Sequence, residues 1–222
     1  MSDDDHEIGF FDYSPVEELA PIWVAHDIAI CLGDVPAPSR ERHPGPTVIR
    51  LERHEIFGTG GHPSTKGAIR VMRELLLWGG VSLPFLEVGA TTGILALVAA
   101  SQGIKQVYHG SDFVQAAALA EDNAKRNDLR ITTEPMIIST DLDERFEFYQ
   151  TIATTVGGSI AALEWIPSIY HSLAPSGSLI WAGHRARDHR DIKARLEEFF
   201  EPVAVSDLEG WPVILLQKGV GL

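Results

Sequence analysis

The chain of 222 residues is long enough for one domain with a complete hydrophobic core. Its hydrophobic content of 45% and charged content of 22% are those of a soluble globular protein, and no apolar run is long enough to cross a bilayer. The net charge of −13 argues against nucleic acid as a partner, because an acidic chain has no general attraction for phosphate backbones.

The N-terminal sequence MSDDDHEIGFF lacks the basic region of a signal peptide, so the cytoplasm is the expected location. The single cysteine, Cys31, excludes an internal disulfide and a cysteine-rich metal site. The nine histidines show no metal-ligand spacing with carboxylates. We therefore expect no metal site and no membrane contact, and the sequence carries no signature of an oligomeric state.

Residues 1–46 lack a regular pattern, and the proline-rich stretch APSRERHPGP (37–46) indicates a loop. We predict that residues 1–46 form an irregular extension that packs over the active site, and that residues 47–222 form the main domain. From residue 62 onward, helical and extended patterns alternate. Helices are predicted at 66–79, 94–103, 114–127, 159–174 (interrupted at Pro167) and 191–200, and strands at 84–88, 105–110, 136–139, 150–155 and 178–183.

The last two strands, 203–208 and 211–218, flank a tight Glu209-Gly210 turn and are predicted to form a hairpin. The whole pattern predicts an α/β fold with a doubly wound, mostly parallel seven-stranded sheet and a C-terminal antiparallel hairpin at one edge. A ligand is then expected beyond the carboxyl ends of the strands, near the point where the strand order reverses.

The turn in FLEVGATTGILAL (85–97) is the first candidate site. Gly89 and Gly93 allow a tight turn, and the helix that follows offers free N–H groups to an anionic group. The spacing G-x-x-x-G differs from the dinucleotide fingerprint G-x-G-x-x-G, which argues against a nicotinamide cofactor. Glu87, two residues before the first glycine, suits a cationic ligand instead.

This turn resembles motif I of the class I methyltransferases that use S-adenosylmethionine (SAM), a ligand that carries an ammonium and a sulfonium. An ordinary strand-turn-helix is the alternative. A second segment, FGTGGHPST (57–65), resembles the FGTG-x-H-x-[ST]-T segment of the PrmA family, which methylates a ribosomal stalk protein; a glycine-rich surface loop is the alternative. EDNAKRN (121–127) and SLAPSGSLIWAGH (172–184) extend the resemblance over about residues 47–218.

The resemblance implies a Rossmann-like methyltransferase fold with SAM as cofactor. It places Phe57 and Thr59 against the cofactor, with Phe113 near the adenine. The other cofactor contacts that it implies are Glu87, Gly89, Ala90 and Gly93 at the methionine end, Asp112 at the ribose, and Asp141 at the adenine amine. A solvated turn is the alternative for Asp141.

Several positions depart from the family pattern. Thr91 replaces the middle glycine of motif I, and strict alignment places Ser111 where the family has the ribose-binding acid, so Asp112 requires a one-residue deletion. Thr154 or Thr155 replaces an asparagine near the methyl-accepting amine. No counterpart of the family's separate N-terminal domain is evident, so a ribosomal substrate is not expected.

Catalysis of methyl transfer rests mainly on aligning the acceptor with the methyl group, and an acceptor that must lose a proton needs a base. His62, His184 and Thr155 are the catalytic candidates, with structural or solvent-facing roles as the alternative for both histidines. Trp165 and Tyr170 are acceptor-pocket candidates or core residues. The predicted function is SAM-dependent methyl transfer to a small molecule or peptide; a cyclase or lyase that uses SAM differently and a non-catalytic binding partner are the alternatives.

Overall fold

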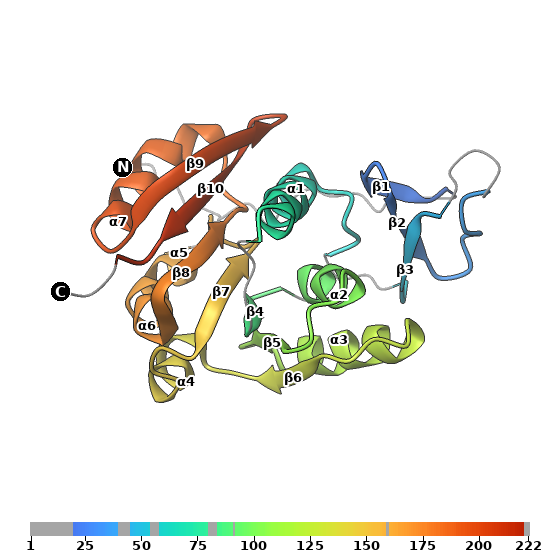
Figure 1. Ribbon diagram of the computed structural model, residues 1–222, viewed down its shortest axis with the longest axis horizontal. Coiled ribbons are helices and arrows are strands. Elements are labelled where there is room, and N and C mark those ends of the chain that lie inside the picture. Colours follow the sequence, from blue (N-terminus) through green and yellow to red (C-terminus); the bar gives the residue numbers. More distant parts are fainter. Residues whose placement is uncertain are drawn as a thin grey trace, which may run out of the picture.

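The computed structural model describes residues 20–39, 45–53, 58–79, 84–90, 92–158 and 160–219. In these residues a seven-stranded sheet has the order β6-β5-β4-β7-β8-β10-β9, and a three-stranded sheet has the order β1-β2-β3 (Figure 1). The larger sheet consists of β4 (Phe85–Val88), β5 (Val107–Ser111), β6 (Thr132–Pro135), β7 (Tyr149–Thr154), β8 (Leu173–Trp181), β9 (Glu201–Leu208) and β10 (Trp211–Gln217).

The strands from β6 to β8 run parallel, while β10 runs antiparallel to both β8 and β9. The predicted mostly parallel sheet with a C-terminal hairpin is thus confirmed. In the hairpin turn, Glu209 and Gly210 both have positive φ, as a two-residue type I′ turn requires. Because β4 pairs with β5 on one side and β7 on the other, its carboxyl end is the switch point of the sheet.

The sheet is covered on both faces, as the alternation along β4 shows. Phe85 belongs to a buried cluster with side chains of α1 and α2, whereas the next residue, Leu86, belongs to a second cluster with side chains of α6 and α7. Successive strand residues point to opposite faces, so the two clusters lie on opposite sides. The helices are α1 (Pro63–Leu77), α2 (Ile94–Ser101), α3 (Val114–Arg126), α4 (Ile138–Asp141), α5 (Ile160–Glu164), α6 (Ile166–Ser172) and α7 (His189–Glu197), with 3-10 turns η1 (Leu142–Glu144) and η2 (Ala186–Asp188).

The expectation that residues 1–46 are irregular is wrong for their described part. β1 (Ile22–Ala25) pairs antiparallel with β2 (Ile28–Leu32), and β2 pairs parallel with β3 (Thr47–Leu51), which lies in the predicted main domain. These strands share one buried cluster with α1 and α2. The apolar residues of such short strands form stable structure only by packing on the rest of the chain.

The predicted strand at 136–139 is also wrong. The sixth strand ends at Pro135, and α4 follows because the Asp141 carboxylate accepts a hydrogen bond from the Ile137 backbone N–H (2.7 Å). The predicted interruption at Pro167 is confirmed, since α5 ends at Glu164 and α6 begins at Ile166 with Pro167 in its first turn.

Candidate active site

The turn between β4 and α2 lies at the switch point of the sheet. Gly89 (φ +76°) and Gly93 (φ +71°) are both in the left-handed region that favours glycine. A Cβ atom on Gly89 would lie 2.6 Å from Val156 Cγ2 and 2.8 Å from the Trp165 ring, and one on Gly93 would lie 2.8 Å from Ala120 Cβ. Both glycines therefore make room for side chains of the protein itself. Trp165 is a core residue, with 6% of its surface exposed.

The Glu87 carboxylate has no exposed surface. Its Oε1 and Oε2 accept hydrogen bonds from the backbone N–H groups of Leu95 (3.2 Å) and Ala96 (2.9 Å) in the first turn of α2. Burial raises the pKa of Glu87 to about 7, against the opposing effect of these two donors. The structure places Glu87 as a cap for α2, and its contact with a ligand stays a prediction.

His109 on β5 is a buried residue of this region that the sequence patterns did not single out. It is the register partner of Glu87 and is 1% exposed. Its Nε2 lies 2.9 Å from the carbonyl oxygen of Ala90, and Nδ1 has no hydrogen-bond partner in the described part of the chain. Burial lowers the pKa of His109, which indicates a neutral ring that carries its proton on Nε2 and donates it to Ala90. The Ala90 carbonyl is thus held by the protein.

Residues 58–62 lie between this turn and the small sheet. The Thr92 hydroxyl donates a hydrogen bond to the Gly58 carbonyl oxygen (2.8 Å). Gly60 has φ +83°, and a Cβ atom there would lie 2.2 Å from Ile30 Cδ1 on β2. Glycine at position 60 therefore lets this loop pack tightly on the N-terminal strands.

Thr59 is partly exposed in the same loop, and its hydroxyl accepts a long hydrogen bond from the Gly61 backbone N–H (3.4 Å). Phe57, the other cofactor residue expected here, and Thr91 in motif I lie outside the described residues. The structure therefore describes Thr59 alone of the two cofactor contacts expected from this segment.

Two asparagines of the EDNAKRN segment tie α3 to β3 and to motif I. Asn123 Oδ1 accepts from the Glu52 backbone N–H (2.8 Å), and Asn123 Nδ2 donates to the Thr92 carbonyl (3.1 Å). Asn127 accepts from the Arg50 backbone N–H and donates to the Arg50 carbonyl, both at 2.7 Å. These bonds fix the end of β3, from which the chain enters the 58–62 loop. The segment thus has a positioning role that its pattern alone did not specify.

The acid at the end of β5 is Asp112. Ser111 is 1% exposed, and its hydroxyl accepts a hydrogen bond from the Phe113 backbone N–H (3.3 Å). Asp112 is exposed in the bend that follows, with Phe113 beside it in the chain (43% exposed). Ile137, after the neighbouring strand β6, is 62% exposed. The carboxylate and the two exposed apolar side chains thus follow two neighbouring strands at the carboxyl end of the sheet.

Asp141 lies in α4. Its carboxylate accepts hydrogen bonds from the Ile137 backbone N–H and from the Thr140 hydroxyl (3.2 Å). It therefore stabilises the short helix, and its predicted contact with an adenine amine remains a prediction.

His62 begins α1 as its N-cap. Its Nδ1 accepts a hydrogen bond from the Ser64 backbone N–H (3.2 Å), and its ring packs edge-on against Trp211, with centroids 4.3 Å apart. The Arg185 guanidinium lies 5.2 Å from the centre of the same Trp211 ring. Burial and the positive charge of Arg185 lower the pKa of His62. Since Nδ1 is an acceptor, the neutral ring carries its proton on Nε2.

His184 lies next to Arg185 in the chain and is 1% exposed. Its Nε2 lies 3.1 Å from Nδ1 of His189, and the two rings stack. Burial, followed by the neighbouring His189, lowers the pKa of His184 to about 4. Contact through Trp211 and Arg185 thus brings the two candidate bases to the same end of the sheet, although both are held by other side chains.

The segment after β7 lies against the segment that carries His184. Thr154 is fully buried, and its hydroxyl accepts from the Val156 backbone N–H (3.3 Å). Thr155 is partly exposed. A Cβ atom on Gly183 (φ +98°) would lie 2.0 Å from the Thr155 carbonyl oxygen. Of the two threonines considered in place of the asparagine, Thr155 is therefore the one with exposed surface, and its contact with an acceptor stays a prediction.

The family model for ribosomal protein L11 methyltransferase (PrmA) matches residues 13–219. The chain belongs to this family. Among its relatives, the ribosomal protein L11 methyltransferase of Caldanaerobacter subterraneus subsp. tengcongensis is 28% identical over 78% of this chain and 54% of the relative. That of Trichlorobacter lovleyi is 29% identical over 86% of this chain and 63% of the relative. The chain therefore spans about half to two thirds of the length of these relatives.

Among solved structures, the ribosomal protein L11 methylase from Lactobacillus delbrueckii subsp. bulgaricus superposes with a TM-score of 0.75 at 21% identity, over 90% of this chain and 99% of that chain. The N-methyltransferase NodS from Bradyrhizobium japonicum, in complex with S-adenosyl-L-homocysteine, gives 0.57 at 16% identity, over 71% and 88%. These likenesses confirm the predicted Rossmann-like methyltransferase fold.

The expectations about the acceptor are corrected by the comparisons. A small-molecule or peptide acceptor was expected and a ribosomal substrate was not, but the family and its relatives are named for a ribosomal protein, which contradicts the small molecule and agrees in part with the peptide. That expectation rested on the N-terminal part of the sequence, whose described strands pack with α1 and α2. Among the helices within the described ranges, none is long and apolar enough to cross a membrane.

Proposed function

We propose that this protein transfers a methyl group from SAM to a protein acceptor, and that the acceptor is ribosomal protein L11. The observation that carries the proposal is the exposed Asp112 carboxylate next to the switch-point turn. A carboxylate in this position accepts hydrogen bonds from both hydroxyls of a ribose. The exposed rings and methyl groups of Phe113 and Ile137 offer apolar surface to an adenine. Family membership over residues 13–219 supports the same reading.

Bound SAM supplies an activated methyl group on its sulfonium. The protein must hold the acceptor in line with that group, and an acceptor amine must first be neutral. In our proposal His184 is not the base, because a group with a pKa of about 4 does not take a proton from an ammonium with a pKa of about 10. Arg185 lowers the pKa of a nearby acceptor ammonium by charge repulsion, so the proton leaves to solvent.

His62 and Thr155 have orienting roles in this proposal. The neutral His62 ring has Nδ1 engaged by the Ser64 backbone, so it acts as a hydrogen-bond donor and not as a base. The Thr155 hydroxyl accepts a hydrogen bond from the acceptor amine, which is the role expected for the asparagine that it replaces.

The test is methyl transfer to purified ribosomal protein L11, followed by mass spectrometry of the acceptor and chromatography of the nucleoside product. We expect one S-adenosylhomocysteine for each methyl group added. Asp112→Ala should weaken SAM binding about tenfold, as for loss of a charged hydrogen-bond acceptor. Asp122→Ala, which removes an exposed acid from α3, is the matched control and should leave binding unchanged.

Two outcomes would overturn the proposal. SAM bound with no methyl transfer to L11 would favour a binding role or another acceptor. Conversion of SAM to a product other than S-adenosylhomocysteine would indicate cyclase or lyase chemistry on the same fold.

A further inference from the structure

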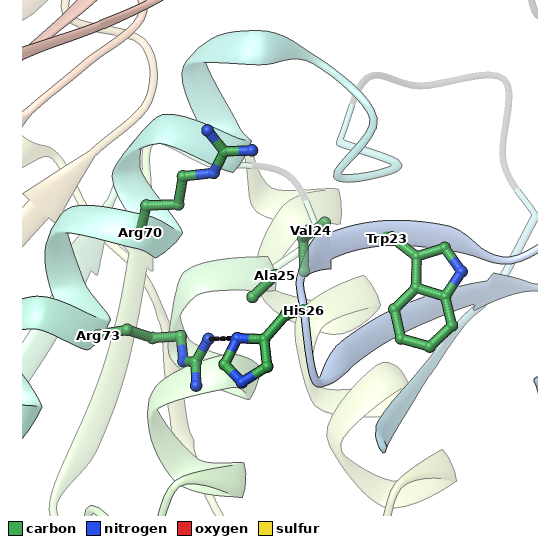
Figure 2. A pocket seen from close by; sticks show the side chains of 6 residues that line it. All are labelled: Trp23, Val24, Ala25, His26, Arg70 and Arg73. Atoms are coloured by element: carbon green, nitrogen blue, oxygen red, sulfur yellow. Dashed lines mark hydrogen bonds between the residues drawn. The ribbon is translucent and has the colours of Figure 1, made fainter. Parts of the chain in front are cut away.

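A basic groove lies between the β1-β2 hairpin and α1, and none of its described lining residues is among those assigned to SAM. It is open to solvent and has a volume of about 880 Å³. Figure 2 shows Arg70 and Arg73 on the α1 wall, with Trp23 and His26 on the hairpin wall. The described lining residues, none of them acidic, are Trp23, Val24, Ala25, His26, Arg70 and Arg73. Such a groove is notable on a chain with a net charge of −13.

The two arginines differ in their partners. Arg73 Nη2 lies 2.8 Å from Asp27 Oδ2, and its Nη1 lies 3.4 Å from His26 Nδ1 (Figure 2). Arg73 therefore joins α1 to the hairpin and builds the wall. Arg70 is exposed, and no hydrogen bond or ion pair joins it to another described residue. Glu74, one helical turn away on α1, does not pair with it either. Within the described part of the chain, Arg70 is thus a cation in the groove without a carboxylate partner.

Helix α1 connects the groove to the candidate acceptor end. The helix is capped by His62, and Arg70 follows eight residues later, which is about 12 Å along the axis at 1.5 Å per residue. An extended peptide covers that distance in roughly three to five residues, at about 3.4 Å each. A polypeptide with its methylated residue near His62 can therefore place a nearby side chain at Arg70.

We propose that the groove binds an acidic segment of the protein acceptor. A carboxylate about three to five positions from the methylated residue pairs with Arg70, because a guanidinium accommodates both oxygens of a carboxylate. Charge complementarity favours this occupant: Arg73 is paired with Asp27, whereas Arg70 in the same groove has no carboxylate partner among the described residues. This inference rests on the proposed function and adds a specificity site to it.

The first test measures binding without catalysis. The probes are a fluorescein-labelled glutamate-rich octapeptide and the same peptide with glutamine at every glutamate. Fluorescence anisotropy should show tighter binding of the acidic peptide, and Arg70→Glu should weaken that binding about tenfold, since it replaces a charge-assisted hydrogen bond by repulsion. Arg190→Glu on α7, where the side chain is 96% exposed, makes the same change in net charge and should alter binding less than about twofold. Equal binding of both peptides, or equal losses in the two variants, would overturn the proposal.

The second test uses ribosomal protein L11. Arg70→Glu should raise KM for L11 while kcat and the affinity for SAM stay unchanged. If the parent protein does not methylate L11, the proposed function fails. The anisotropy result alone then shows whether the groove binds an acidic peptide. A variant without residues 2–7, which include four acids, tests the chain's own N-terminus as the occupant. Tighter peptide binding by this variant would show that the groove binds its own acidic segment and would overturn the assignment to the acceptor.

Discussion

Replacing Asn123 by alanine should loosen the connection between β3, motif I and α3. Asn123 is fully buried; its amide accepts from the Glu52 backbone N–H (2.8 Å) and donates to the Thr92 carbonyl (3.1 Å). Alanine leaves both backbone groups without these partners. We expect a lower free energy of unfolding and weaker SAM binding, because the same segment leads into the 58–62 loop.

The magnitude follows from the two hydrogen bonds. A buried backbone group left unsatisfied costs about 1–3 kcal/mol, which gives roughly 2–6 kcal/mol for two. Glu52 is exposed, so water can reach its N–H, and we expect the lower half of that range, roughly 2–4 kcal/mol. In a domain of this size, about 1 kcal/mol lowers Tm by about 2–4 °C, so the variant should unfold roughly 5–15 °C below the parent.

Thermal and urea unfolding followed by circular dichroism measure the change in stability, and calorimetric titration measures SAM affinity. Glu121→Ala, on the exposed face of the same helix, is the control and should stay within about 0.5 kcal/mol of the parent. An Asn123→Ala variant within about 1 kcal/mol of the parent would refute the reasoning that these bonds hold the site together.

Three further predictions concern the same region. Folding raises the pKa of Glu87 from 4.5 to about 7, so the folded state binds the proton more tightly and the free energy of unfolding should fall by roughly 3 kcal/mol as pH rises between these values. Urea unfolding of Glu87→Gln over the same pH range should lack this fall. An unchanged dependence of the unfolding free energy on pH in this variant would contradict the assignment. Gly183→Ala should cost about 2 kcal/mol or more and reduce methyl transfer, because its Cβ would meet the Thr155 carbonyl. Gly103→Ala, with a similar φ and open space, is its control and should cost only about 1 kcal/mol in thermal unfolding. Thr92→Val should weaken SAM binding in calorimetry and cost about 1 kcal/mol, through loss of its hydrogen bond to Gly58; equal affinity would show that the bond does not position the loop.

Local patterns were sufficient for much of the fold. The alternation of apolar strands with amphipathic helices predicted the parallel sheet, because side-chain periodicity reports directly which face of an element is buried. Gly89, Gly93 and the Glu209-Gly210 turn were recognisable from single residues, because glycine is favoured where the backbone adopts a positive φ. Of the two neighbours at the end of β5, Ser111 is buried and Asp112 is exposed, and the contact of Asp112 with a ribose stays a prediction.

Other features were decided only by tertiary structure. β1 and β2 were missed because short strands among prolines have no clear periodicity, and their apolar side chains are stabilised by α1 and α2. The cap that Glu87 forms on α2 and the buried His109 beside it depend on packing between separate elements. Trp211 and Arg185 reach His62 from the far end of the chain. Sequence periodicity records that a residue is buried, but the folded chain determines which distant partner satisfies its charge or hydrogen bond.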